Sequence, residues 1–229
     1  MALTYLLDIL GTLVFAVSGA FRAVKYELDF LGVLVLAVAT GVGGGILRDI
    51  LIGSVPPAAF RDETYLFVCL LGGLLVFLAA PKIARRWDLV MAADAVGLGV
   101  FSAIGAAKAA EFHLGPLGIV MMSVLTATGG GVIRDILVSE IPAVIRVDFY
   151  ATAALCGGLC FLAAGLAGLG ETLQLFSSIL VATGLRLVAM IYRINLPRVH
   201  SLPESPTELT QKRKAGKKTG PETQGPRHR

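Results

Sequence analysis

Long apolar runs separated by short polar segments make up most of the chain. A helix that crosses the hydrocarbon core of a bilayer, about 30 Å thick, needs roughly 20 mainly apolar residues. Seven runs approach this length and predict seven transmembrane helices, with approximate ranges 3–23, 30–52, 65–80, 89–110, 116–138, 149–169 and 173–194. The expected fold class is therefore all-α and integral to the membrane.

The second and fifth runs carry the same interruption. Residues 40–56 read TGVGGGILRDILIGSVP and residues 126–142 read TATGGGVIRDILVSEIP, so matched positions differ by 86. The match extends beyond the motif to further pairs, among them Asp8 and Asp94, Gly11 and Gly97, Phe15 and Phe101, and, after a one-residue gap, Tyr65 and Tyr150. A motif of this length, repeated at a fixed offset, indicates internal duplication.

Each copy of the duplication covers three predicted helices. Repeat one spans residues 3–80, repeat two spans 89–169, and the seventh helix, 173–195, has no counterpart. Because three is an odd number, the second repeat must enter the membrane from the side opposite to the first. This predicts inverted-topology repeats related by a pseudo-twofold axis in the membrane plane.

Three consecutive glycines lie within each interrupted run: Gly43, Gly44 and Gly45, and Gly129, Gly130 and Gly131. Glycine costs about 1 kcal/mol relative to alanine inside a helix, so the triplets predict breaks in the second and fifth helices. Freed backbone groups survive in a bilayer only where protein or water shelters them. We therefore expect the breaks to face each other near mid-membrane, where half-helix ends would coordinate a cation or a small zwitterion.

Charged side chains also lie inside the predicted helices: Asp8, Arg48, Asp49, Asp94, Arg134 and Asp135. Such groups are costly in lipid unless they are paired or wet. Neighbouring helical positions diverge by about 100°, so we expect partners across the pseudo-twofold axis: Arg48 with Asp135 or Asp94, and Arg134 with Asp49 or Asp8. These charged residues either form structural ion pairs or line a transport pathway. Thr40 and Thr126 either cap the broken turns or line a pathway.

Composition and charge support a multi-pass membrane protein. Hydrophobic residues make up 55% of the chain, the net charge is +4, and residues 197–229 hold eight of the 20 Lys and Arg residues. This segment lacks apolar periodicity and is predicted to be a disordered, basic cytoplasmic tail after a membrane domain of residues 1–196. Loop charges likewise favour an outer N-terminus and a cytoplasmic C-terminus in a bacterial inner membrane. We expect contact with membrane lipids and not with nucleic acid.

Enzymatic and metal chemistry find no support in the sequence. Neither glycine triplet is followed by the Lys-Ser/Thr pair of a phosphate-binding loop. The three cysteines show no metal-like spacing with the three histidines. We therefore expect neither an enzyme nor a cofactor or metal site.

Two GGGxxRD motifs within a plan of three, three and one helices make the sequence resemble the prokaryotic trimeric intracellular cation (TRIC) channel family, also known as a glycine-transporter-like (UPF0126-type) membrane family. The resemblance covers residues 3–195. It implies a homotrimer with a separate pore in each protomer, bent second and fifth helices, and permeation by potassium and, to a lesser extent, sodium. The two glycine triplets would form the bends, with Arg48, Asp49, Arg134 and Asp135 beside the pore.

The expected function is therefore a passive, cation-selective channel. Its cation preference would come from backbone carbonyls at the breaks and from Asp8, Asp49, Asp94 and Asp135. The alternative is a secondary carrier for glycine or another small amino acid, with the breaks as an alternating-access site. A third interpretation is a structural membrane protein whose glycines only let helices pack closely.

Overall fold

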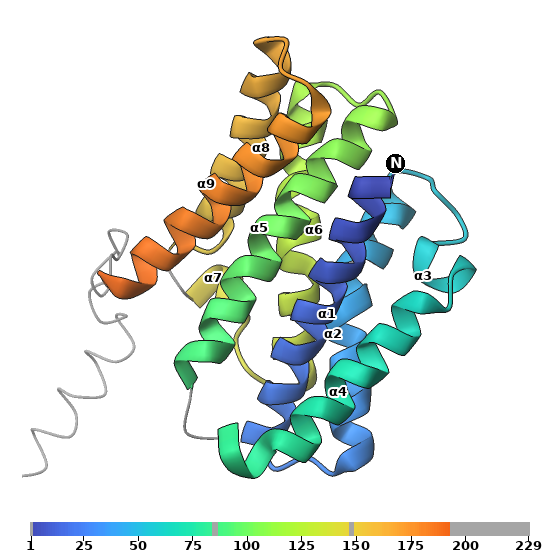
Figure 1. Ribbon diagram of the computed structural model, residues 1–229, viewed down its shortest axis with the longest axis vertical. Coiled ribbons are helices and arrows are strands. Elements are labelled where there is room, and N and C mark those ends of the chain that lie inside the picture. The colour runs from blue at the N-terminus through green and yellow to red at the C-terminus, as the bar shows by residue number, and fades with distance from the viewer. Residues whose placement is uncertain (1, 84–86, 147–148, 193–229) are drawn as a thin grey trace, which may run out of the picture. The chain divides into compact units, whose positions relative to one another are not determined.

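The computed structural model of the protein describes residues 2–83, 87–146 and 149–192, and the regular structure in these ranges is helical (Figure 1). The helices are α1 (Ala2–Lys25), α2 (Phe30–Leu51), α3 (Ala58–Arg61), α4 (Thr64–Ile83), α5 (Trp87–Glu111), α6 (Pro116–Leu137), α7 (Ala143–Arg146), α8 (Ala151–Leu166) and α9 (Glu171–Ile191). The predicted tail of residues 197–229 and its boundary at 196 lie outside the described residues, as does much of the basic charge behind the predicted orientation.

Five of the described helices are long and apolar enough to cross a membrane: α1, α2, α5 from Met91, α6 and α9. Two others, α4 and α8, are apolar over shorter stretches, Thr64–Ala79 and Ala151–Leu166. The all-α class is therefore confirmed with five candidate membrane spans, and a crossing by all seven long helices stays a prediction. The four-residue helices α3 and α7 lie in the connections that follow α2 and α6.

Equivalent helices pack in the same way in the two repeats. α1 contacts α2 and α4, while α5 contacts α6 and α8. Contacts of α1 with α5 and of α2 with α6 join the two three-helix groups, and α9 lies against α5 and α8 (Figure 1). The interiors of the two groups are thus equivalent, whereas α9 gives repeat two a different neighbourhood.

α2 and α6 continue as α-helices through their glycine triplets, so the predicted breaks are wrong. The reason is that these two helices cross in backbone contact. A Cβ on Gly44 would meet the carbonyl oxygen of Thr126, and a Cβ on Gly130 would meet that of Thr40. Glycine permits this approach, and tertiary packing outweighs its low helix propensity. The triplets of α2 and α6 therefore present no half-helix ends that could coordinate an ion.

An aromatic pair fills the centre of the contact between α1 and α5. The fully buried rings of Phe15 and Phe101 have centroids 5.1 Å apart and an interplanar angle of 60°. Two glycines leave room for them, because a Cβ on Gly11 would lie 2.6 Å from the Phe101 ring and one on Gly97 would lie 3.3 Å from the Phe15 ring. Both the phenylalanines and the glycines are repeat counterparts, so the apolar centre follows the duplication.

Candidate functional site

The first charge cluster consists of Asp8, Arg48, Asp49 and Tyr65, all of them buried. Arg48 Nε donates to Asp49 Oδ1 at 2.8 Å, and Arg48 Nη1 and Nη2 donate to the two carboxylate oxygens of Asp8 at 3.3 and 3.2 Å. The Tyr65 hydroxyl donates to Asp8 Oδ2 at 3.1 Å. The second oxygen of Asp49 accepts the backbone N–H of Ala58, at the start of α3, at 2.9 Å. One guanidinium therefore holds two carboxylates from different helices.

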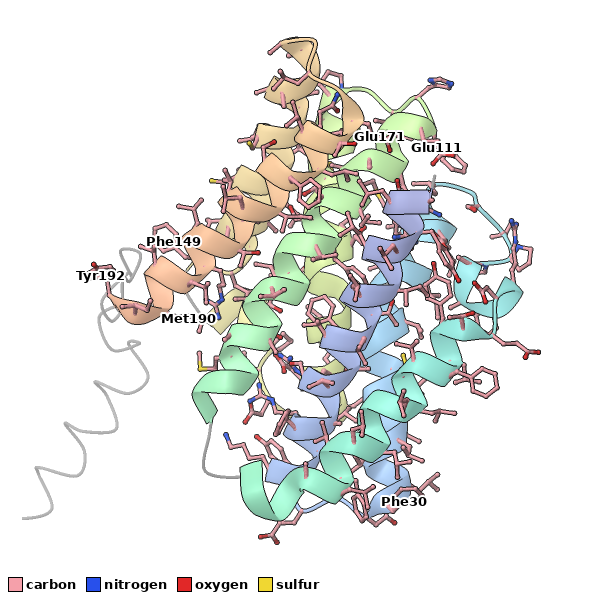
Figure 2. The ribbon with its side chains drawn as sticks, in the orientation of Figure 1. Phe30, Glu111, Phe149, Glu171, Met190 and Tyr192 are labelled. Atoms are coloured by element: carbon pink, nitrogen blue, oxygen red, sulfur yellow. The ribbon has the colours of Figure 1, made fainter. Side chains whose placement is uncertain are left out.

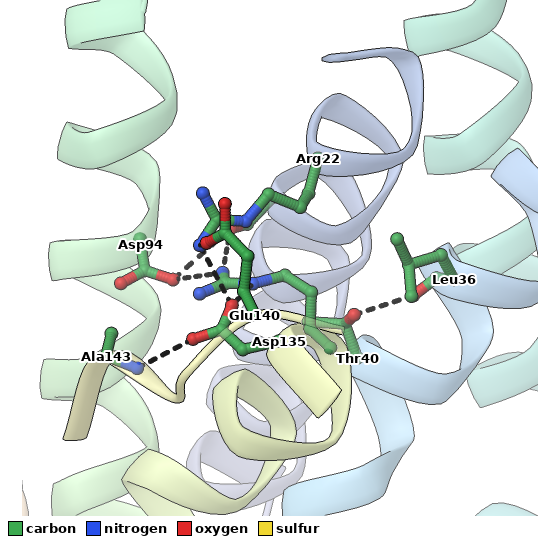
Figure 3. Close-up of polar contacts among 9 residues, drawn as sticks. Arg22, Leu36, Thr40, Asp94, Asp135, Glu140 and Ala143 are labelled. Carbon is green, nitrogen blue, oxygen red and sulfur yellow. Dashed lines mark hydrogen bonds and ion pairs between the residues drawn. The ribbon is translucent and has the colours of Figure 1, made fainter. Parts of the chain in front are cut away.

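The second charge cluster consists of the repeat counterparts Asp94, Arg134, Asp135 and Tyr150, which are also buried. Arg134 Nε donates to Asp135 Oδ1 at 3.0 Å, and Arg134 Nη1 donates to Asp94 Oδ1 at 2.6 Å. Asp135 Oδ2 accepts the backbone N–H of Ala143, at the start of α7, at 2.8 Å (Figure 3). The second cluster thus repeats the pairing of the first, except that Arg134 donates to one oxygen of Asp94 whereas Arg48 donates to both oxygens of Asp8, and that the tyrosine differs.

The expected pairing of charges between repeats is wrong for all four combinations, because each arginine pairs within its own repeat. Arg48 binds Asp8 and Asp49, and Arg134 binds Asp94 and Asp135. Although neighbouring positions diverge on a helix, an arginine side chain is long enough to turn its Nε towards the next residue. Each aspartate uses its other oxygen to hold the short helix that follows, which gives the Arg-Asp pair a role in shaping the connection.

Contacts between the repeats come from α1 instead. Ser18 Oγ accepts Arg134 Nη1 at 2.7 Å and donates to Asp94 Oδ1 at 3.2 Å. Arg22 Nη2 donates to Asp135 Oδ1 at 3.0 Å and forms an ion pair with Glu140 Oε2 at 3.2 Å. The second cluster therefore receives an additional cation from repeat one.

The two tyrosines mark a further difference between the clusters. Tyr65 donates to Asp8, whereas the buried hydroxyl of Tyr150 has no hydrogen-bond partner within the described ranges. The Arg186 guanidinium, from α9, lies 4.9 Å from the centroid of the Tyr150 ring. Because α9 belongs to neither repeat, it changes the surroundings of the second cluster alone.

The predicted threonines lie at the glycine crossing and not at a broken turn. Thr40 Oγ1 donates to the carbonyl oxygen of Leu36 at 2.6 Å, one turn back in the same continuous helix (Figure 3). Thr126 Oγ1 is buried and has no partner in the part of the chain that the structure describes. The capping role is therefore wrong, and both residues contribute their carbonyl oxygens to the contact between α2 and α6.

A cavity of about 530 Å³, here called the vestibule, opens beside the first charge cluster. Its lining includes the polar side chains of Tyr5, Asp8, Tyr65, Lys108, Glu111 and Glu171. Glu111 and Glu171 lie at the same end of the helical group (Figure 2). A second space of about 10 Å³, enough for roughly one water, lies next to Asp8, Thr12 and Arg48. The linings of both spaces include Asp8 and Tyr65 of the first cluster.

The aromatic pair lies between the two clusters along α1. Asp8 belongs to the first cluster, Phe15 follows two turns later, and Ser18 contacts the second. One face of α1 therefore runs from a carboxylate through an apolar ring to a hydroxyl. Phe15 and Phe101, like Tyr65 and Tyr150, match in the repeat alignment, but none of these four residues was expected at the site. Ser18 and Arg22 were not expected there either, although their spacing of three to four residues places them on this face.

Comparison with known proteins agrees with this duplicated architecture. The family described as "Glycine transporter" matches residues 5–81 and 91–165, two blocks that follow the repeats. The UPF0126 inner membrane protein YadS of Escherichia coli is 42% identical over 159 residues, which cover 69% of this chain and 76% of that protein.

Two solved structures share the fold. A TRIC cation channel has 36% sequence identity and a TM-score of 0.80, covering 86% of this chain and 98% of its own. The TRIC channel orthologue from Rhodobacter sphaeroides has 34% identity and a TM-score of 0.81, with 85% and 100% covered. The matches span nearly all of both channel structures, and the relatives are membrane proteins. This chain therefore belongs to the TRIC/UPF0126 family of membrane proteins.

Proposed function

We propose that the protein is a potassium-permeable cation channel of the inner membrane, with an ion route inside each protomer. The observation that carries the proposal is the fold shared with TRIC cation channels over 85–86% of the chain. The duplicated charge clusters and the vestibule give that fold a polar route through an apolar helical group. The route runs from the vestibule past Asp8 and Arg48 towards Ser18 and Asp94.

We assign the selectivity for cations to the acidic side chains of the vestibule and not to backbone carbonyls. The vestibule lining contains three carboxylates, those of Asp8, Glu111 and Glu171, and one ammonium, that of Lys108. An excess of negative charge in a cavity with low-dielectric walls concentrates cations and repels anions. Potassium and sodium both fit this description, and the preference for potassium rests on the likeness to TRIC channels.

The aromatic pair closes the route in this conformation. Phe15 and Phe101 are fully buried and in ring contact between the clusters, and an apolar constriction of this kind excludes water and ions. Conduction therefore requires the two rings to separate.

We place the N-terminus and the vestibule outside and the C-terminus in the cytoplasm. We also propose seven crossings, inverted repeats and a homotrimer, with lipids around the apolar faces.

A carrier for glycine or another small amino acid is the second candidate. The description of the matching family as a glycine transporter favours it, and so does the presence of both an ammonium and carboxylates in the vestibule. A carrier would alternate the access of this site between the two sides, with the aromatic pair as one of its closed points.

Planar-bilayer recording of the purified protein separates the two candidates. A channel gives unitary current steps and, under a potassium chloride gradient, a reversal potential with the sign of a potassium-selective pathway. A carrier gives no unitary steps, and liposomes that contain it exchange labelled glycine at a rate that saturates. Saturating glycine exchange without unitary currents would overturn the channel proposal.

The vestibule predicts an effect of salt on conductance. Replacing Glu111 and Glu171 together by glutamine should lower potassium conductance roughly twofold at 0.1 M salt, because fewer cations gather at the entrance. At 1 M salt the Debye length falls to about 3 Å, so the variant should approach the wild type. Glu63→Gln, at an exposed position outside the vestibule lining, is the matched control. Equal loss at both salt concentrations would contradict the electrostatic explanation.

A further inference from the structure

Arg22 and Lys108 are repeat counterparts, 86 positions apart, with different surroundings. Arg22 forms ion pairs with Asp135 and Glu140 at 3.0 and 3.2 Å. Lys108 lines the vestibule and forms no ion pair with the residues that the structure describes. The counterpart of Glu140 is Ser54, which carries no charge. The two ends of the proposed route are therefore related by the repeat, but they differ in one respect. The basic side chain at the second cluster, Arg22, forms ion pairs, whereas the basic side chain at the vestibule, Lys108, forms none with the described residues.

The position of Arg22 places its guanidinium at the edge of the second cluster. Figure 3 shows Arg22 extending from α1 towards Asp135 and Glu140, which come from the end of α6 and the segment after it. The side chain of Arg22 is 13% exposed and that of Glu140 is 25% exposed, whereas that of Asp135 is fully buried. The guanidinium thus lies between solvent and the buried carboxylate, where an ion leaving the second cluster would pass.

The charges of the two clusters explain why a cation is held there. In the first cluster one arginine faces two carboxylates, which leaves one negative charge beside the open vestibule. In the second, Arg134 contacts two carboxylates and Glu140 lies beside them, so Arg22 supplies a cation where negative charge is in excess. Carboxylates accept guanidinium through charge-assisted hydrogen bonds. A hydrated or partly dehydrated monovalent cation is attracted to the same place.

We propose that Arg22 is a tethered cation that occupies and closes the route at the second cluster, and that a permeating cation passes only when this guanidinium leaves Asp135 and Glu140. The site between these two carboxylates is therefore a cation site filled by the protein itself. Its ligand class is a monovalent cation, including free guanidinium. The inference rests on the proposed channel function and adds a second closed point to the aromatic pair.

Arg22→Gln tests the proposal in planar bilayers. The open probability in symmetrical potassium chloride should rise about tenfold or more, because the charge-assisted contacts of Arg22 with Asp135 and Glu140 are both lost. Guanidinium chloride at millimolar concentration, added to the side that Arg22 faces, should reduce the current of the variant. The same addition to the opposite side should have a smaller effect, and the wild type should be insensitive because its own guanidinium fills the site.

Two further variants keep the result interpretable. Arg61→Gln removes an exposed arginine that lies outside both charge clusters and donates to the carbonyl oxygen of Val55 at 2.7 Å, and it should behave as wild type. If Arg22→Gln does not yield folded protein, Glu140→Gln removes one partner of Arg22 and should raise the open probability by a smaller factor. The melting temperature of each variant in detergent shows whether it is folded.

The possible failures are distinct. Wild-type channels with normal potassium currents, together with a folded Arg22→Gln variant of unchanged open probability and no one-sided guanidinium block, would overturn the role of Arg22 alone. Arg22 would then be a structural contact between the repeats. Absence of potassium current from the wild type and from every variant would overturn the proposed channel function and this inference with it.

Discussion

Alanine at Gly44 or Gly130 is expected to lower the stability of the folded protein by about 1–3 kcal/mol. Each added methyl group would meet a backbone carbonyl oxygen of the crossing helix, that of Thr126 or that of Thr40. A backbone atom cannot move aside as the end of a flexible side chain can, so α2 and α6 must separate. Their separation would weaken the contact that joins the two repeats. Unfolding of the purified variants in detergent, followed by circular dichroism, measures the loss.

Gly45 is the control within the same triplet. A Cβ there would have only the Arg48 guanidinium as a near neighbour, at 3.7 Å, which is ordinary van der Waals contact. Gly45→Ala should therefore leave stability unchanged or raise it by about 0.4–1 kcal/mol, because alanine restricts the unfolded chain and favours the helix. Equal destabilisation at Gly44 and Gly45 would mean that the triplet acts through flexibility and not through the crossing.

The glycine triplets show which part of the fold can be predicted from sequence. Apolar length reveals the helices and the offset of 86 reveals the duplication, because both are properties of the chain itself. Whether a glycine bends a helix or admits a neighbour depends on what lies against it. Helix propensity alone predicts a break at Gly44. The helix instead continues there, and the glycine lets its backbone approach the carbonyl oxygen of Thr126. A glycine triplet in the sequence is therefore compatible both with a break in a helix and with a close crossing of two helices.

The sequence predicted which charged residues belong to the candidate site, but not which of them form ion pairs with each other. Asp8, Arg48 and Asp49 stand out as charges in apolar helices, and they do lie together. Their pairing depends on the direction in which an arginine side chain turns, which helical periodicity does not fix. The vestibule could not be predicted, since Tyr5, Glu111 and Glu171 become neighbours only when α1, α5 and α9 meet. Arg22 could have been found by extending the repeat alignment to Lys108.

Arg48→Met should destabilise the protein by about 3–5 kcal/mol, the cost of leaving a buried carboxylate without its cation. Arg48 is the only arginine or lysine that forms ion pairs with Asp8 and Asp49 in the described part of the chain. Methionine fills much of the same volume, so the loss would come from charge and not from a cavity. Equilibrium unfolding in mixed micelles, with rising amounts of denaturing detergent, gives the free energy of unfolding.

Asp8→Asn provides the partner for a double-mutant cycle. The asparagine oxygen still accepts a hydrogen bond, and Arg48 keeps Asp49, so this single change should cost less than Arg48→Met. With both changes one unpaired carboxylate remains instead of two. The double variant should therefore be more stable than Arg48→Met alone, which is a coupling between contacting residues. Additive losses would mean that Arg48 and Asp8 do not interact energetically despite their 3.2 Å separation.

The same change in the second cluster should cost less, and the reason is its different charge environment. In Arg134→Met, Asp135 still binds Arg22 at 3.0 Å, and the Arg186 guanidinium remains stacked on Tyr150, a neighbour of the cluster. Lys108, the repeat counterpart of Arg22, lines the vestibule but forms no ion pair with Asp8 or Asp49 in the described part of the chain. A larger loss for Arg48→Met than for Arg134→Met would therefore show that the duplicated clusters are unequal in charge. Equal losses, or the reverse order, would mean that Arg22 does not compensate the carboxylates it contacts.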